Sequence, residues 1–246
     1  MIQAAEERRR TGRKRVLVLF DIDLTLIKTS GAGMAAMGDA GRELFGPDFD
    51  ETRTDFAGRL DPLIIRDLLR DNGIEPTPAR CRDMRAGYAR HLPRRLESHG
   101  AQPLPGAIDL VNQLHAVPGL TLGLLTGNFE ETGRLKLRAA GVDTSAFVCN
   151  VWGDESPHKE PAREDLPPIA IERYRARHNT DLSGQGVTII GDTVHDVSCA
   201  LANGCRVLAV ATGYTSAAEL QRAGAHRVVG DLSDVEAIKA WLLDVE

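Results

Sequence analysis

The strongest constraint on the fold is an alternation of short, almost continuous apolar runs with longer stretches whose apolar residues recur at helical spacing. An apolar run without polar alternation is typical of a strand that is covered on both faces of a parallel sheet. Strand, helix and strand in succession indicate an open α/β sheet with right-handed crossovers. We expect strands at 16–20, 120–125, 147–151, 187–190 and 206–210, with a weaker candidate at 227–229.

Helices of crossover length are expected between the later strands. Asn128-x-x-Glu131 resembles a capping box at the start of one of them. Gly141 and Gly204 stand where two of the helices should stop, since glycine is common just after a helix. The expected helices cover 107–117, 130–140, 169–177 and 196–203.

The stretch between about Ser30 and Pro105 contains no convincing strand. Its apolar residues recur at helical spacing, and glycine and proline mark the turns between them. The fold class is therefore α/β: a Rossmann-like open parallel sheet core with an inserted all-helical cap domain. We expect the chain to divide into a basic N-terminal tail at 1–14, a discontinuous core at 15–29 plus 106–246, and a helical cap at 30–105.

Composition excludes several classes of protein. The 246 residues are 42% apolar with a formal net charge of −5, which is too apolar and too balanced for a disordered chain and lacks the basic excess of a nucleic-acid coat. No apolar run approaches the roughly 20 residues of a membrane helix. We therefore expect no nucleic-acid or membrane partner; monomer and homodimer are both compatible with the sequence.

Cysteine usage indicates the compartment. The four cysteines form no C-x-x-C pair, and we expect reduced, buried or half-buried thiols at Cys81, Cys149, Cys199 and Cys205. The N-terminus is basic, but the apolar run that follows is too short for a secretory signal. Both observations favour a cytoplasmic location.

Polar side chains follow three of the expected strands, at the edge where open α/β sheets bind their ligands. Converging carboxylates repel one another unless a cation lies among them or one stays protonated. Mg²⁺ prefers oxygen ligands and commonly shares a substrate phosphate, so the pattern predicts Mg²⁺ rather than a set of ordinary solvated aspartates. The three segments are Asp21-x-Asp23-x-Thr25, Thr126-Gly127-Asn128 and Gly191-Asp192-Thr193-x-x-Asp196.

These motifs, their order and the helical insertion after the first resemble the haloacid dehalogenase-like hydrolase superfamily. Within it the chain looks most like the phosphoglycolate phosphatase-type members with a small helical cap. The resemblance covers nearly the whole chain apart from the basic tail. It implies a Mg²⁺-dependent phosphatase that hydrolyses a small phosphorylated metabolite, a phosphate ester, through an aspartyl-phosphate.

The resemblance also implies roles for the aspartates. Asp21 is the expected nucleophile. Asp23 is expected to protonate the leaving alcohol and then to deprotonate the attacking water. Asp21 and Asp192, with the backbone carbonyl of Asp23, are expected to hold Mg²⁺, and Asp196 to support this metal shell.

The second motif is expected to bind the phosphate group. Thr126 and the amide that follows it, at Gly127, would donate hydrogen bonds to phosphate oxygens near the start of a helix. Asn128 and Arg59 complete the expected substrate-binding set. Arg59 is the candidate substrate anchor, because in similar proteins a cap loop reaches over the active site and arginine suits an anionic or hydroxylated group.

The family's remaining element is a cation, usually a lysine followed by proline. Here Lys159 is followed by Glu160, and Arg163 stands a few residues later, just before the next helix. The spacing to that helix favours Arg163 over Lys159, and its fork suits phosphate. His195 lies within the last motif, but since Asp23 already fills the role of base we expect it to be a bystander.

Alternative functions differ in the residues they require. Members that cleave carbon–halogen bonds typically lack the second aspartate, so Asp23 argues against that reaction. A Schiff-base lysine within the cap is excluded, because no lysine occurs between Lys28 and Lys136. A phosphoglucomutase-type phosphoryl transfer shares the core motifs and stays an alternative. A catalytically silent binding module predicts the loss of the nucleophile or a metal ligand and is less favoured.

Overall fold

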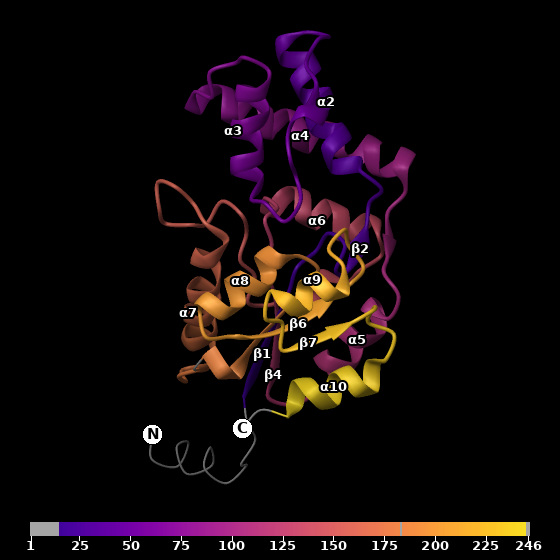
Figure 1. Ribbon diagram of the computed structural model, residues 1–246, viewed down its shortest axis with the longest axis vertical. Coiled ribbons are helices and arrows are strands. Elements are labelled where there is room, and N and C mark those ends of the chain that lie inside the picture. The colour runs from indigo at the N-terminus through magenta and orange to yellow at the C-terminus, as the bar shows by residue number, and fades with distance from the viewer. Residues whose placement is uncertain (1–14, 183, 245–246) are drawn as a thin grey trace.

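The computed structural model describes residues 15–182 and 184–244, and its centre is a five-stranded parallel sheet of order β4-β1-β5-β6-β7 (Figure 1). The expected open parallel sheet is confirmed, including the weak last strand. The basic tail predicted at 1–14 lies outside the described residues. The strands are β1 Val16–Phe20, β4 Leu120–Leu124, β5 Val187–Gly191, β6 Arg206–Val210 and β7 Arg227–Val229.

Helices cover both faces of this sheet, which explains why its strands are apolar throughout. Val18 and Phe20 of β1 pack on the side of α5 (Ala107–His115), α6 (Glu130–Ala139) and α10 (Val235–Leu243). Leu17 and Leu19 alternate with them and pack on the opposite side. That side carries α7 (Leu166–His178), α8 (Val194–Ala202) and α9 (Ala217–Arg222).

The strand expected at 147–151 is wrong. This segment makes only two isolated bridges beside β4, at Phe147 and Val151. Between them the side chain of Asn150 accepts the Leu124 N–H at 3.0 Å, in place of a backbone carbonyl. Because a side-chain amide takes over the ladder bond, the segment follows the sheet edge without becoming a strand.

The inserted helices form a separate layer beyond the sheet, at the top of Figure 1. They are α2 Ala32–Phe45, α3 Asp61–Asp71 and α4 Pro78–His99, and they bury an apolar core of their own. The expected helical cap is thus confirmed in kind. The stretch is not free of strand, however, because β3 (Gln102–Pro103) pairs antiparallel with β2 (Ile27–Lys28) where the chain passes between core and cap. A two-residue, exposed strand that contains proline carries no periodic signal.

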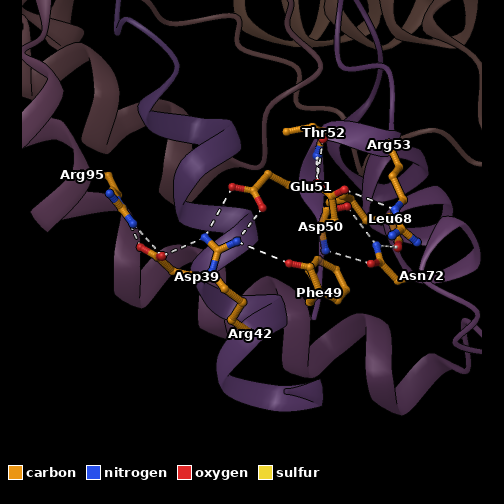
Figure 2. Close-up of polar contacts among 10 residues, drawn as sticks. All are labelled: Asp39, Arg42, Phe49, Asp50, Glu51, Thr52, Arg53, Leu68, Asn72 and Arg95. Carbon is orange, nitrogen blue, oxygen red and sulfur yellow. Dashed lines mark hydrogen bonds and ion pairs between the residues drawn. The ribbon is translucent and has the colours of Figure 1, made fainter. Parts of the chain in front are cut away.

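Polar contacts fix the connection between α2 and α3 (Figure 2). Arg42 forms ion pairs with Glu51 at 2.6 Å and with Asp39 at 3.1 Å. Asn72, just after α3, accepts the Asp50 N–H at 2.8 Å and donates to the Asp50 carbonyl at 3.1 Å. The cap loop, which we define as residues 54–60, begins directly after this anchored segment.

The structure also bears on two expectations from the sequence, the state of the cysteines and the lack of a membrane helix. The four cysteines are free thiols; Cys149, Cys199 and Cys205 are buried and Cys81 is half-buried. Among the helices of residues 15–182 and 184–244, none has both the length and the apolar character needed to cross a bilayer.

Candidate active site

A cavity of about 610 Å³ lies at the carboxyl ends of the central strands, between the sheet and the cap. The structure brings most of the expected site residues to its wall. They are Asp21, Asp23, Arg59, Thr126, Gly127, Asn128, Arg163 and Asp192. Asp196 does not line the cavity but lies directly behind this wall, where it contacts Arg163.

Three of the expected metal ligands form a buried acidic cluster. Asp21 follows β1, Asp192 follows β5, and Asp196 lies in the first turn of α8; each offers an oxygen within 4.8 Å of the other two. The Asp192 carboxylate accepts a hydrogen bond from the Thr25 hydroxyl at 3.4 Å. Buried carboxylate oxygens this close together fit a hard divalent cation such as Mg²⁺. The carboxylate of Asp23 is not part of the cluster.

Burial and mutual repulsion disfavour the ionised form of this cluster. Burial raises the pKa of Asp21 to about 6, although the Arg163 guanidinium opposes the shift. Burial, with repulsion from Asp196 and Asp21, raises the pKa of Asp192 to about 8. A divalent cation among these carboxylates would stabilise their charged form. The donor set therefore fits a metal site.

Arg163 is the cation of this cluster. Its Nη2 lies 3.1 Å from Asp21 and 2.5 Å from Asp196, and its Nη1 donates to the Gly58 carbonyl in the cap loop at 3.3 Å. Burial opposes the charge of Arg163, but the two carboxylates raise its pKa above the usual value. Its buried Nε–H has no partner within the described residues and is free to donate. Lys159 is exposed and does not line the cavity, so the geometry favours Arg163.

Local helix chemistry places the Asp196 carboxylate. One oxygen, Oδ2, accepts the backbone N–H of Thr193 at 3.0 Å and its hydroxyl at 2.6 Å, and Thr193 in turn caps the first turn of α8. The other oxygen, Oδ1, binds Arg163. Both oxygens are therefore used within the protein, and Asp196 is better placed to support the cluster than to contact a cation directly.

A second buried cation, Lys136, was not expected at the site. Its Nζ lies 2.7 Å from Asp23 Oδ2 and 2.7 Å from Asn128 Oδ1. Asn128 Nδ2 donates to the same Asp23 oxygen at 2.9 Å and to Thr126 Oγ1 at 2.8 Å. Burial lowers the pKa of Lys136, but the Asp23 carboxylate, with Tyr88 and Asp61, raises it by more. The net pKa lies above the usual value, so the ammonium stays charged.

The sequence does contain a signal for Lys136. Gly133, Lys136, Leu137 and Ala140 recur at helical spacing and therefore share one face of the helix expected at 130–140. All four are buried. A lysine on an otherwise small and apolar face is the pattern that would have identified it.

Asp61 of the cap binds the start of α6. The expected capping box at Asn128-x-x-Glu131 is wrong, because the Asn128 amide is occupied by other site side chains and Phe129 is the N-cap. Instead, Asp61 Oδ2 accepts the Phe129 N–H at 3.0 Å, and the Asp61 N–H donates to the Gly127 carbonyl at 2.7 Å. Burial raises the pKa of Asp61 to about 7, opposed by the nearby Lys136 ammonium.

Arg59 lines the cavity, but its charge is engaged within the cap. Its guanidinium binds the Asp67 carboxylate and, at 3.0 Å, the Asp55 carbonyl. Its backbone packs against the core, since a Cβ at Gly127 would lie 2.2 Å from the Arg59 carbonyl oxygen. The geometry therefore does not favour Arg59 as the substrate anchor, and it gives Gly127 a steric reason to lack a side chain.

Glycines also allow the cap to approach the core elsewhere. Gly58 has φ +65° in the cap loop, and a Cβ there would lie 2.8 Å from the ring of His195. His195 is exposed, and its role as a bystander stays a prediction. A Cβ at Gly33, near the start of α2, would lie 3.4 Å from Lys136 Nζ. The cap and the core are thus in direct contact around the site.

Comparison with known proteins agrees with this fold and identifies the family. The family model for haloacid dehalogenase-like hydrolases matches residues 18–201, which is most of the chain. This protein therefore belongs to the haloacid dehalogenase-like hydrolases and is an enzyme of that hydrolase family.

Curated relatives and solved structures match over nearly their whole lengths. Phosphoglycolate phosphatase of Thiobacillus denitrificans is 25% identical, over 88% of this chain and 92% of its own. That of Nitrosospira multiformis is 27% identical, over 87% and 91%. The crystal structure of a hydrolase from Pseudomonas syringae superimposes with a TM-score of 0.70 at 24% identity, covering 93% of this chain and 99% of that one.

The Asp61 carboxyl predicts a pH-dependent stability. The pKa of Asp61 is higher in the folded protein than in an unfolded chain, so folding takes up a proton. The contribution of Asp61 to the free energy of unfolding is therefore lost as the pH rises through about 7. Asp61→Asn cannot ionise. We expect the free energy of unfolding of the wild type, relative to this variant, to fall by about 2–3 kcal/mol between about pH 5 and about pH 8, as measured by urea denaturation.

The matched control is Asp83→Asn, which changes an exposed carboxylate on the same cap. Its stability should follow the wild type at every pH. Parallel pH profiles for the wild type and Asp61→Asn would contradict the account of Asp61.

Proposed function

We propose that this enzyme is a Mg²⁺-dependent phosphatase that hydrolyses a small phosphorylated metabolite in the cytoplasm, through an aspartyl-phosphate on Asp21. The observation that carries the proposal is the buried cluster of Asp21, Asp192 and Asp196 beside Arg163. This cluster adjoins a cavity large enough for a small phosphate ester. Phosphate monoester hydrolysis is among the slowest uncatalysed reactions, so its catalysis requires the strong electrostatic stabilisation that such concentrated charge can supply.

The metal would be held by the carboxylates of Asp21 and Asp192 and the backbone carbonyl of Asp23, with Asp196 in support. When bound, Mg²⁺ offsets the negative charge of the phosphoryl oxygens and of the nucleophile. Arg163 Nη2 lies 3.1 Å from Asp21 Oδ1, so the guanidinium helps to orient the nucleophile.

In the first step a carboxylate oxygen of Asp21 attacks phosphorus, and the bond from phosphorus to the ester oxygen breaks. The leaving oxygen takes a proton from Asp23, whose carboxyl then carries the negative charge. In the second step water attacks phosphorus, Asp23 accepts its proton, and the bond from phosphorus to Asp21 breaks. Inorganic phosphate and free Asp21 result.

Three donors are available for the phosphoryl oxygens. Thr126 is buried at the cavity wall; its hydroxyl oxygen accepts from Asn128, and its hydrogen has no acceptor among the described residues. The Gly127 N–H follows it near the start of α6, where the helix dipole favours an anion. The unpartnered Nε–H of Arg163 is the third.

The proposed function predicts metal-dependent release of phosphate from a panel of esters. Phosphoglycolate heads the panel, because the curated relatives are phosphoglycolate phosphatases. Release should need Mg²⁺, stop with EDTA and fall by more than about 10³-fold in Asp21→Asn, which loses the nucleophile. Inorganic phosphate is measured directly.

Two results would overturn this proposal. One is a folded wild type that releases phosphate from no ester. The other is conversion of a sugar phosphate into its isomer without phosphate release, which would instead establish the mutase alternative.

A further prediction distinguishes the two candidate cations, Arg163 and Lys159. Arg163→Met should lower kcat/KM by about 100-fold or more, because it removes the charge beside Asp21, whereas Lys159→Met should change it by less than about 2-fold. Arg163→Lys keeps the charge and should retain more activity than Arg163→Met. Thermal unfolding of each variant checks that it is folded. Loss of turnover in the Lys159 variant alone would contradict the assignment.

A further inference from the structure

Lys136 is a buried charge that the two proposed chemical steps do not use. It projects from α6, and its side chain is only 7% exposed. Burying an ammonium is costly unless it is paired and hydrogen-bonded, and among residues 15–182 and 184–244 Lys136 meets that condition through Asp23 and Asn128. The lysine is therefore tied to the residue that carries the proton in the proposed reaction.

The hydrogen bonds to Asp23 are all on one side of its carboxyl. Lys136 Nζ at 2.7 Å and Asn128 Nδ2 at 2.9 Å both donate to Oδ2. Within the described residues, no hydrogen bond reaches Oδ1. The Asp23 side chain is 35% exposed and lines the cavity, so Oδ1 is the oxygen left for the reacting atoms.

Lys136 also fixes the amide that shares this oxygen. Its Nζ binds Asn128 Oδ1, so the Asn128 amide must turn its Nδ2 toward Asp23 and Thr126. On the cap side, Gly33 packs close to the lysine, since a Cβ there would lie in ordinary contact with Nζ, at 3.4 Å. The ammonium and the oriented amide therefore both restrain the Oδ2 side of the Asp23 carboxyl.

We propose that Lys136 is a positioning residue for Asp23: it holds Oδ2 so that Oδ1 carries the proton to the leaving-group oxygen and later receives the proton of water. This rests on the proposed phosphatase function. In the first step the Oδ1–H bond breaks, the bond from hydrogen to the leaving oxygen forms, and the electron pair stays on the carboxylate. The Lys136 ammonium lies beside that carboxylate as it forms.

The proposal predicts a dependence on the leaving group. An alkyl phosphate needs its leaving oxygen protonated, whereas p-nitrophenyl phosphate releases a stable anion and needs less help. The measured quantity is kcat/KM, which reports the steps up to release of the alcohol. In Lys136→Met, kcat/KM should fall by about 100-fold for an alkyl phosphate and by less than about 10-fold for p-nitrophenyl phosphate.

Arg138→Met is the matched control, because it removes an exposed charge from the same helix. It should leave kcat/KM unchanged for both substrates. The Asp23→Asn background gives a second test. There the proton donor is already absent, so adding Lys136→Met should produce no further selectivity between the two substrates. Thermal unfolding shows whether each variant is folded.

Equal losses for the two substrates in an active, folded Lys136→Met enzyme would overturn the positioning role and leave the phosphatase proposal intact. Unchanged kcat/KM in that variant would overturn it as well. A folded wild type that releases phosphate from no ester of the whole panel would overturn the phosphatase function and this inference with it.

Discussion

The ion pairs of buried Arg163 with Asp21 and Asp196 hold this structure's site together. They join the end of β1 to the first turn of α8, and a further bond from Arg163 to Gly58 reaches the cap. One guanidinium cannot balance three buried carboxylates, and Asp192 is left with a pKa raised to about 8 by burial and its acidic neighbours. The deficit of positive charge is the physical basis for expecting a divalent cation.

The two aspartates of the first motif thus occupy different electrostatic settings. Asp21 lies against Arg163 within the acidic cluster, whereas Asp23 lies against Lys136 outside that cluster. Each has its own buried cation, although only two positions separate them. This division suits a nucleophile and a proton carrier that must not exchange roles. The cap contacts both settings, because the Gly58 carbonyl accepts a hydrogen bond from Arg163 and Gly33 packs close to Lys136.

The sequence predicted what is periodic or local and missed what depends on side chains meeting across elements. Four apolar runs predicted strands correctly, because both faces of the sheet are buried there, and the weaker candidate at 227–229 is a strand as well. The strand at 147–151 failed because Asn150 replaces a backbone partner, and the capping box failed because Asp61, distant in sequence, caps α6. Lys136 was missed because no motif contains it, although its helix face indicates burial. The roles of the site residues stay predictions.

The phosphorylated enzyme tests the central claim most directly. Asp23→Asn should still accept the phosphoryl group of p-nitrophenyl phosphate, whose leaving group needs little protonation, but should hydrolyse it slowly because the base for water is gone. With Mg²⁺ present, rapid mixing should give a burst of p-nitrophenol equal to the enzyme concentration, and peptide mass spectrometry after acid quench should find the phosphate on Asp21. Turnover without a burst, or phosphate on another residue, would contradict the account.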